Sequence, residues 1–428
     1  MQPHSGLFSL ILIVPILLLI MPAMHARGET AAVSLTLAEA EAIALQSDPL
    51  MESFAASAEG LREEAVADAQ WQDPKLKLGM INLPTNSFSR SREPMTQLQM
   101  GIQQAFPRGN SLEHAGEETA AMAEVEAAKR ENRRLLVLRS VRRAYLELYF
   151  HIHRQELLEE NRELFSRLLE ITERQYAVGR DAQHDVMRAQ LELSLLDSRL
   201  LEAQGDEEAA RAELAQWILH QHAGLPLAEE FPTLAPVPSM AEIHGRSPEH
   251  PLIRARDAYV DARESRVAMA EEQFKPGWML DITYSERTGQ SLDGVARPDL
   301  FSVMVLVDIP LFTGKRQDKR LSAARKQVAA ERFSRTDRLR RLIRDAEQQY
   351  AQWRQLNDRY DLYRQRALID ANRNTEVTLK AYQNNITDFT TLMRASLAEL
   401  DVQLELLRVR IERAKARAGL LYFTGENS

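Results

Sequence analysis

The chain has 428 residues, of which 44% are hydrophobic and 27% charged, and its net charge at pH 7 is -8. This acidic balance, without a basic patch interleaved with aromatic residues, argues against nucleic acid as a partner. The absence of cysteine excludes disulfides, thiolate metal sites, cysteine nucleophiles and a lipidated N-terminal cysteine.

Residues 1–26 have the features of a secretory signal peptide. An apolar run from Leu7 to Ile20 is followed by Met24-His25-Ala26 and the charged Arg27. A run of about 14 apolar residues is short for a membrane-spanning helix, so we expect cleavage after Ala26 rather than a membrane anchor. No later stretch is apolar for the roughly 18 residues that a spanning helix needs. An exported chain of this kind is either a soluble periplasmic protein or a β-barrel.

The first repeat, residues 27–223, begins with an alanine-rich helical pattern that ends near Gln72. The period then changes to the alternation of strands, which we expect near 75–84 and 96–106, each with one apolar and one polar face. A loop rich in serine, proline and asparagine separates the two strands.

A long helical hairpin is expected over residues 111–219. This stretch contains no proline, and it reverses around Tyr176-Ala177-Val178-Gly179. Its first arm, as one continuous helix, would be about 100 Å long, several times the diameter of an ordinary domain. The hairpin therefore belongs to an elongated structure.

The second half of the sequence repeats the first. Matching residues recur at a nearly constant offset: Pro49 and Pro251 (202 residues), Pro74 and Pro276 (202), Gly109 and Gly314 (205), Tyr176 and Tyr382 (206). Around the turns, Val186-Met187-Arg188-Ala189 aligns with Leu392-Met393-Arg394-Ala395. Such an offset across helix, strands and hairpin indicates a duplicated unit.

The second repeat, residues 241–428, follows a proline-rich linker at 224–240. It predicts a helix, two strands near 277–287 and 299–311, and a second long helical hairpin over 315–420. Its strands have one continuous apolar face and one mixed or polar face, as membrane-barrel strands do. A half-buried soluble sheet has the same period, and export favours the barrel.

Four strands per chain cannot close a membrane barrel, because known barrels begin at about eight strands. An open edge facing lipid would leave backbone groups unpaired at several kcal/mol each. The barrel must therefore be shared between chains. Three chains supply twelve strands, and twelve leave a lumen where eight are filled by side chains.

Heptad rows on the hairpins predict close antiparallel helix packing. One row after the first turn carries mainly large residues and a second row mixes small and large ones: Val186, Leu193, Leu200, Glu207, Leu214; Ala189, Leu196, Ala203, Ala210, Trp217. The second repeat shows Ala395, Val402, Val409 and Ala416 at the same spacing.

These features together resemble the TolC family of outer-membrane efflux proteins. The likeness rests on the repeat, on Gln103-Gln104-Ala105-Phe106-Pro107-Arg108-Gly109 with its partner Val307–Gly314, and on the turns at Tyr176–Gly179 and Tyr382–Asn385. The resemblance implies an α+β membrane protein: a homotrimer with a twelve-stranded outer-membrane β-barrel and a periplasmic tunnel of antiparallel coiled-coil helices. It implies docking to a periplasmic membrane-fusion adaptor and an inner-membrane pump, for which the RND type is expected. The channel itself would be no enzyme and need no cofactor.

The family pattern places adaptor contacts at the hairpin tips. An apolar residue, a glycine and a polar residue fit it at Val178, Gly179 and Arg180, and the second tip has Asn384, Asn385 and Ile386, with Asn385 in place of glycine. Gly179 also has a local reason to be glycine, because a helix reverses most easily at a residue that tolerates positive φ.

The closed end of the tunnel is the expected place for a gate. The resemblance puts Thr387, Thr391 and Arg394 where relatives carry two aspartates and an arginine, so the chain departs from the family's acidic ring, with Asp388 nearby. In the first repeat, Asp181 and Asp185 could narrow the entrance, or could simply be helix N-terminal charges favoured by the macrodipole.

No metal site is expected. His151-Ile152-His153 and His220-Gln221-His222 place histidines two apart, on different sides of a helix, and we expect the first pair at a solvated surface.

The predicted function is that of an exit duct from an adaptor and pump to the exterior of a Gram-negative cell, spanning from the outer membrane into the periplasm. The alternatives are a type I protein-secretion channel of the same fold and a non-pore periplasmic coiled-coil scaffold. The exported substrate is not encoded in any motif.

Overall fold

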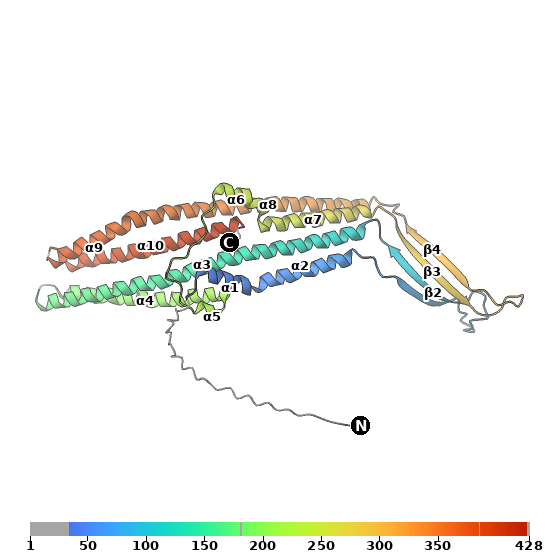
Figure 1. Ribbon diagram of the computed structural model, residues 1–428, viewed down its shortest axis with the longest axis horizontal. Coiled ribbons are helices and arrows are strands. Elements are labelled where there is room, and N and C mark those ends of the chain that lie inside the picture. Colours follow the sequence, from blue (N-terminus) through green and yellow to red (C-terminus); the bar gives the residue numbers. More distant parts are fainter. Residues whose placement is uncertain (1–33, 180–181, 385, 426–428) are drawn as a thin grey trace, which may run out of the picture.

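The computed structural model describes residues 34–179, 182–384 and 386–425 and shows a long, narrow chain with helices at one end and strands at the other (Figure 1). The signal peptide expected at 1–26 lies outside the described residues. The elements of the first repeat are α1 (Leu37–Ser47), α2 (Pro49–Asp68), β1 (Lys75–Ile81), β2 (Gln97–Phe106), α3 (Ser111–Ala177), α4 (Gln183–Ile218) and α5 (His220–Ala223).

The second repeat follows the same order. It consists of α6 (Met240–Arg246), a 3₁₀ turn (Ser247–Glu249), α7 (Pro251–Glu272), β3 (Gly277–Arg287), β4 (Leu300–Asp308), α8 (Gln317–Leu362), a π-helical segment (Tyr363–Ala367), α9 (Leu368–Gln383) and α10 (Phe389–Phe423). Four strands and two long hairpins in two copies confirm the predicted fold class. Strands β1 and β4 are shorter than the ranges expected for them.

The helix before β1 is divided in two, where the alanine-rich pattern indicated one. Asp48 caps the second piece, since its Oδ1 accepts a hydrogen bond from the N–H of Met51 at 2.9 Å, and Pro49 takes the first helical position. Asp48 also binds Arg133 of α3, at 2.7 Å from Nη2 to Oδ2. A capped start with proline at its first turn is a favourable way to begin a new helix.

The strands form one antiparallel sheet in the order β1-β2-β3-β4. Strands β2 and β3, which come from different repeats, pair along their length, with Phe106 opposite Trp278 and Gln97 opposite Arg287. Rows of apolar residues cross the whole sheet on one face: Leu76, Ile102, Ile282, Val303; and Leu78, Met100, Tyr284, Phe301. We call these rows the apolar belt.

The other face of the sheet is mixed, with small and polar residues beside Met279, Met304 and Leu306. Gly101 lies opposite Lys77 on one side and Thr283 on the other. Because Gly101 has no side chain, Nζ of Lys77 reaches across β2 and binds Asp281 at 2.8 Å. The predicted alternation of apolar and polar faces is confirmed.

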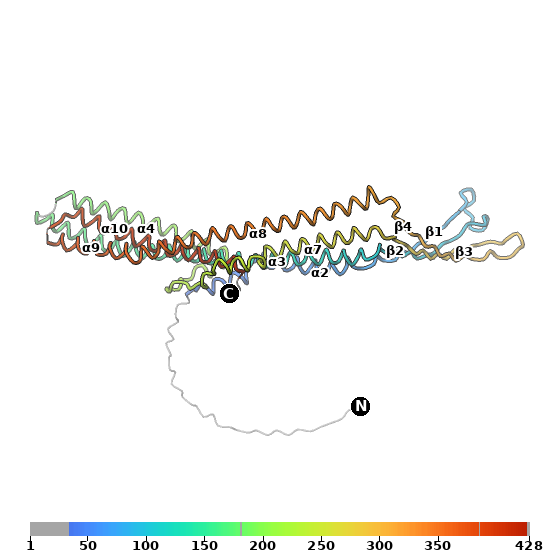
Figure 2. Tube along the Cα trace, turned by 90° about the horizontal axis from the view of Figure 1, so that it is seen from above, coloured from blue at the N-terminus to red at the C-terminus, as the bar shows by residue number. Residues whose placement is uncertain are grey.

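The helices nearest the sheet lie side by side in the order α8, α7, α3, α2 (Figure 1). The long α3 packs against both α2 and α7, and α7 packs against α8. Figure 2 shows α8 along one edge of this layer. The helices α2 and α8 therefore form the two outer edges, as β1 and β4 do in the sheet.

In the half of the molecule away from the sheet, α3 pairs with α4, and α9 pairs with α10. The second heptad row is confirmed as the packing seam, because its members Ala189, Leu196, Ala203 and Ala210 are buried. None of the helices in the described part of the chain combines the length and apolar content needed to cross a membrane.

A buried histidine ties the start of α7 to the end of α10. Nδ1 of His250 accepts a hydrogen bond from the N–H of Leu252 at 3.2 Å, and Nε2 donates to the carbonyl of Tyr422 at 3.1 Å. This pairing uses the neutral ring. Burial lowers the pKa of His250 from 6.5 to about 4, although the Tyr422 carbonyl opposes the shift.

We expect this histidine to make folding pH-dependent. Between pH 6.5 and 4 His250 binds a proton in the unfolded chain but not in the folded chain. Its contribution to stability is therefore complete above pH 6.5 and is lost progressively as the pH falls from 6.5 to about 4. A shift of this size corresponds to about 3 kcal/mol. Thermal unfolding from pH 7 to 4 should show a flatter pH dependence for His250→Asn, which keeps a capping oxygen, than for the natural chain. Equal slopes would contradict the assignment.

Candidate functional site: the hairpin tips and the helices beside them

The first tip is a tight turn built on a glycine. Helix α3 ends at Ala177, and Gly179 follows with φ of 74°, its N–H donating to the carbonyl of Tyr176 at 2.9 Å. A Cβ at this position would meet no heavy atom within 4 Å. Glycine is therefore required here by the backbone and not by a close neighbour. Val178 beside it is 68% exposed.

Of the two aspartates predicted at the entrance of the first tip, the structure describes only Asp185. Arg180 and Asp181 lie outside the described residues. Asp185 is buried, and its Oδ2 accepts a hydrogen bond from the N–H of Ala182 at 3.4 Å, while Nε2 of His184 lies 3.3 Å from its Oδ1. A carboxylate that accepts a backbone hydrogen bond in the first turn of a helix stabilises that turn.

The second tip presents an apolar side chain. Ile386 is 79% exposed, and its N–H donates to the carbonyl of Ala381 at 2.9 Å. Asn384 closes the end of α9, because its Nδ2 donates to the carbonyl of Lys380 at 2.7 Å. Asn385, which replaces the glycine of the first tip, lies outside the described residues. Both tips lie at the same end of the molecule, opposite the sheet (Figure 1).

The start of α10 carries a charge cluster. Oδ1 of Asp388 accepts from the N–H of Thr391 at 2.8 Å and caps the helix. Hydrogen bonds from Thr391 lower the pKa of Asp388, and the positive charges of Arg394 and Arg188 lower it further. Thr391 thus binds Asp388, and the charge of Arg394 acts on the same carboxylate, while Thr387 is half-buried.

Arg188 is the residue of this cluster that sequence reasoning did not select. It comes from α4, so the cluster joins the two hairpins. Its Nε is buried and has no hydrogen-bond partner among residues 34–179, 182–384 and 386–425. The signal was available, because Arg188 aligns with Arg394 in the two repeats.

The two hairpins also share an apolar core just behind the tips. Its members come from all four helices: Phe165, Leu168, Ala189, Leu196, Tyr382, Phe389, Leu392, Met393. The two hairpins are therefore packed against each other behind the tips.

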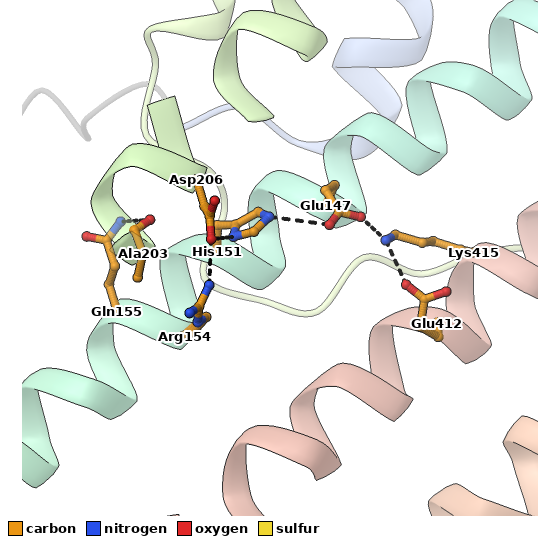
Figure 3. A network of polar contacts seen from close by, with 8 residues as sticks. All are labelled: Glu147, His151, Arg154, Gln155, Ala203, Asp206, Glu412 and Lys415. Atoms are coloured by element: carbon orange, nitrogen blue, oxygen red, sulfur yellow. Dashed lines mark hydrogen bonds and ion pairs between the residues drawn. The ribbon is translucent and has the colours of Figure 1, made fainter. Parts of the chain in front are cut away.

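Further from the tips, a polar network links α3, α4 and α10 (Figure 3). Glu147 contacts Nζ of Lys415 and lies 3.3 Å from Nε2 of His151. Arg154 binds Asp206 of α4 at 2.6 Å. Burial lowers the pKa of His151. The expectation of a solvated surface for this histidine is wrong, because its side chain is 13% exposed and lies between Glu147 of α3 and Asp206 of α4.

The neighbouring His153 does not share this environment. Its ring stacks on Tyr149, with centroids 3.8 Å apart. In the part of the chain that the structure describes, no group of three or more His, Cys, Asp or Glu side chains is arranged to hold a metal ion.

Comparison with protein families gives one match that covers most of the chain. The family model described as "Outer membrane efflux protein" matches residues 42–218 and 248–426, one segment in each repeat. No curated protein matches the chain.

Solved structures with the same fold are numerous. The outer membrane protein VceC of Vibrio cholerae has a TM-score of 0.74 at 18% identity, over 91% of this chain and 96% of its own. The Campylobacter jejuni CmeC outer membrane channel has a TM-score of 0.73 at 13% identity, over 91% of this chain and 85% of its own. The open state of the Neisseria gonorrhoeae MtrE outer membrane channel has a TM-score of 0.69 at 17% identity, over 91% of this chain and 88% of its own. At these identities the likeness establishes the fold.

Proposed function

The chain belongs to the outer membrane efflux protein family and is thus an outer-membrane duct of a tripartite efflux system, and we propose that three copies build the duct. Gram-negative outer membrane and periplasm are the compartments that this assignment implies. The signal peptide proposed at residues 1–26 would direct the chain there.

The observation that carries the proposal is the apolar belt on a four-stranded sheet with two free edges. The belt crosses all four strands, and the opposite face carries Lys77, Gly101, Asp281 and Thr283. Joining β4 of one copy to β1 of the next would pair the edge groups, which lipid cannot satisfy. Three copies would give twelve strands, with the belt toward lipid and the polar face toward a lumen.

The helices continue the duct through the periplasm. Two long hairpins per chain, six per trimer, would form the tunnel wall, and the sheet and the tips lie at its two ends (Figure 1). The exposed apolar belt also argues against a periplasmic scaffold without a pore, since large exposed apolar surfaces are rare on soluble proteins.

The tips are the proposed contact with the adaptor. Val178 and Ile386 are exposed apolar side chains on tight turns, as an adaptor-binding surface requires. The docking set is Val178, Gly179, Arg180, Asn384, Asn385, Ile386. The proposed pump is of the RND type and would supply the energy, so the duct needs no catalytic residue.

The proposed gate lies just above the tips. Its candidates are Asp181, Asp185, Thr387, Asp388, Thr391 and Arg394, and we add Arg188 to them. Because Asp388 lies near two arginines, the entrance charge would be mixed, in contrast to the acidic ring of relatives. A mixed ring would be less selective for cations than an acidic one.

The test is a measurement of assembly and conductance. Purified in detergent, the mature chain should have the mass of three copies, and in a planar lipid bilayer it should form ion-conducting pores. A protein that remains in the aqueous fraction after cell breakage and sediments as a monomer would overturn the proposal.

A further inference from the structure

The outer edge of α8 has an open face. Ala324 and Val328 point toward α7 and are buried. On the opposite side of the helix Lys326, Ala330 and Phe333 follow one another at helical spacing, and all three are exposed. Phe333 is 76% exposed, although it lies in the polar half of the molecule away from the apolar belt.

The outer edge of α2 also has an open face, with small residues and a carboxylate that complement the large and basic side chains of α8. Met51, Ala58 and Ala65 are buried where α2 packs on α3. The opposite side carries Ala56, Gly60 and Glu63, all exposed. A Cβ built on Gly60 would meet no heavy atom within 4 Å. This face is flat and apolar, with a carboxylate at one end.

The chain already contains a buried version of this contact. By the repeat, α3 corresponds to α8 and α7 to α2, and α3 packs on α7. Ala258 and Ala262 of α7, which correspond to Ala56 and Gly60, are buried, and so is Ala128 of α3, which corresponds to Phe333. The pair of faces that is covered between the repeats is therefore open at the two edges of the chain.

The internal contact also sets the register. Glu118 of α3 lies 3.8 Å from Arg266 of α7, and their counterparts are Ala323 and Glu64. Nζ of Lys129 lies 6.0 Å from the ring centroid of Tyr259, and their counterparts are Ser334 and Ser57. We carry these two contacts over to α8 of one copy and an antiparallel α2 of the next. The register between them then places Phe333 beside Ala56 and Lys326 beside Glu63.

We propose that Phe333 of one chain packs on Ala56 and Gly60 of a second copy, and that Lys326 pairs with Glu63 of that copy. The inference rests on the proposed function, because joining β4 to the next β1 brings α8, which follows β4, beside α2, which precedes β1. A large side chain then meets small ones, and a cation meets an anion.

Cysteine cross-linking tests the register directly, because the natural chain has no cysteine. Ala56→Cys combined with Phe333→Cys should form disulfides between copies on oxidation and give dimers and trimers on a non-reducing gel. The matched control is Ala67→Cys with Phe333→Cys. Ala67 lies on the same face of α2 but about 16 Å further along the helix, beyond the reach of a disulfide, so this pair should not cross-link.

A charge exchange tests the ion pair. Lys326→Glu and Glu63→Lys should each lower the temperature at which the detergent-solubilised trimer dissociates, and the double variant should restore it. A trimer in which the Ala56 and Phe333 cysteines fail to cross-link would overturn this interface and leave the proposed duct intact. A single-chain mass for the natural protein would instead remove the proposed duct, and the interface with it.

Discussion

Replacing Gly179 with isoleucine should abolish export while the protein remains in the outer membrane as a trimer. Gly179 has φ of 74°, a conformation in which a β-branched residue is strongly disfavoured. The turn would have to rearrange, and Val178 would leave the position from which we propose it contacts the adaptor. Since no atom lies near the missing Cβ, the change should not disturb packing within the chain. Substrate accumulation in cells, together with the trimer band of the solubilised membrane, measures both effects.

Two further glycine variants separate docking from folding. Gly205 lies within α4, also with open space around it, so Gly205→Ile should leave export unchanged. Gly179→Asn should retain most export, because asparagine tolerates positive φ and the second tip carries Asn385 in that place. Loss of the trimer in Gly179→Ile would show that the turn is a folding element and would contradict the docking role.

The faces of the strands could be predicted from the sequence, but their pairing across the repeats could not. The alternation around Val303 and Val305 reveals which side chains share a face, because the side-chain period of a strand is two. The pairing of Gln103 with Asp281 joins segments that are separated by the entire first hairpin. No short turn fixes that register, and it depends on packing along the whole chain.

The second long helix is interrupted at a point that the local sequence does not indicate. The segment Tyr363–Ala367 is π-helical and separates α8 from α9, whereas α3 in the first repeat is continuous. No proline or glycine occurs in it, so nothing in the sequence indicates an interruption. By contrast, Asp48-Pro49 is a readable start signal, and the division between α1 and α2 could have been predicted from it.

At the tips, Gly179 could be predicted from the sequence because the backbone conformation requires it. The position of Arg188 could not, because it depends on a neighbouring hairpin. Gly179 follows from the need for positive φ where a helix reverses. The approach of Arg188 to Asp388 requires that the two hairpins lie together, and neither helix alone reveals it. The alignment of Arg188 with Arg394 was the only trace in the sequence.

Placing arginine at Val305 should prevent insertion into the membrane. Val305 lies at the middle of β4 and pairs with Leu280, on the same face as the apolar belt. A charge on the lipid-facing surface at the membrane midplane costs about 2–4 kcal/mol, and three copies would raise this to roughly 6–12 kcal/mol for a trimer. We expect Val305→Arg to be lost from the outer-membrane fraction and to accumulate as unassembled chains, measured by membrane fractionation and by the trimer band.

The neighbouring Met304→Arg is the matched control, since Met304 and Val305 are each 56% exposed in the single chain and differ in the face they occupy. Met304 pairs with Asp281 on the polar face. An arginine there would lie in water inside the proposed lumen and beside a carboxylate, so the variant should insert, form trimers and conduct with altered ion selectivity. If both variants insert equally well, β4 does not face lipid and the shared barrel is wrong. If only Met304→Arg fails, the two faces of the sheet are reversed relative to the membrane.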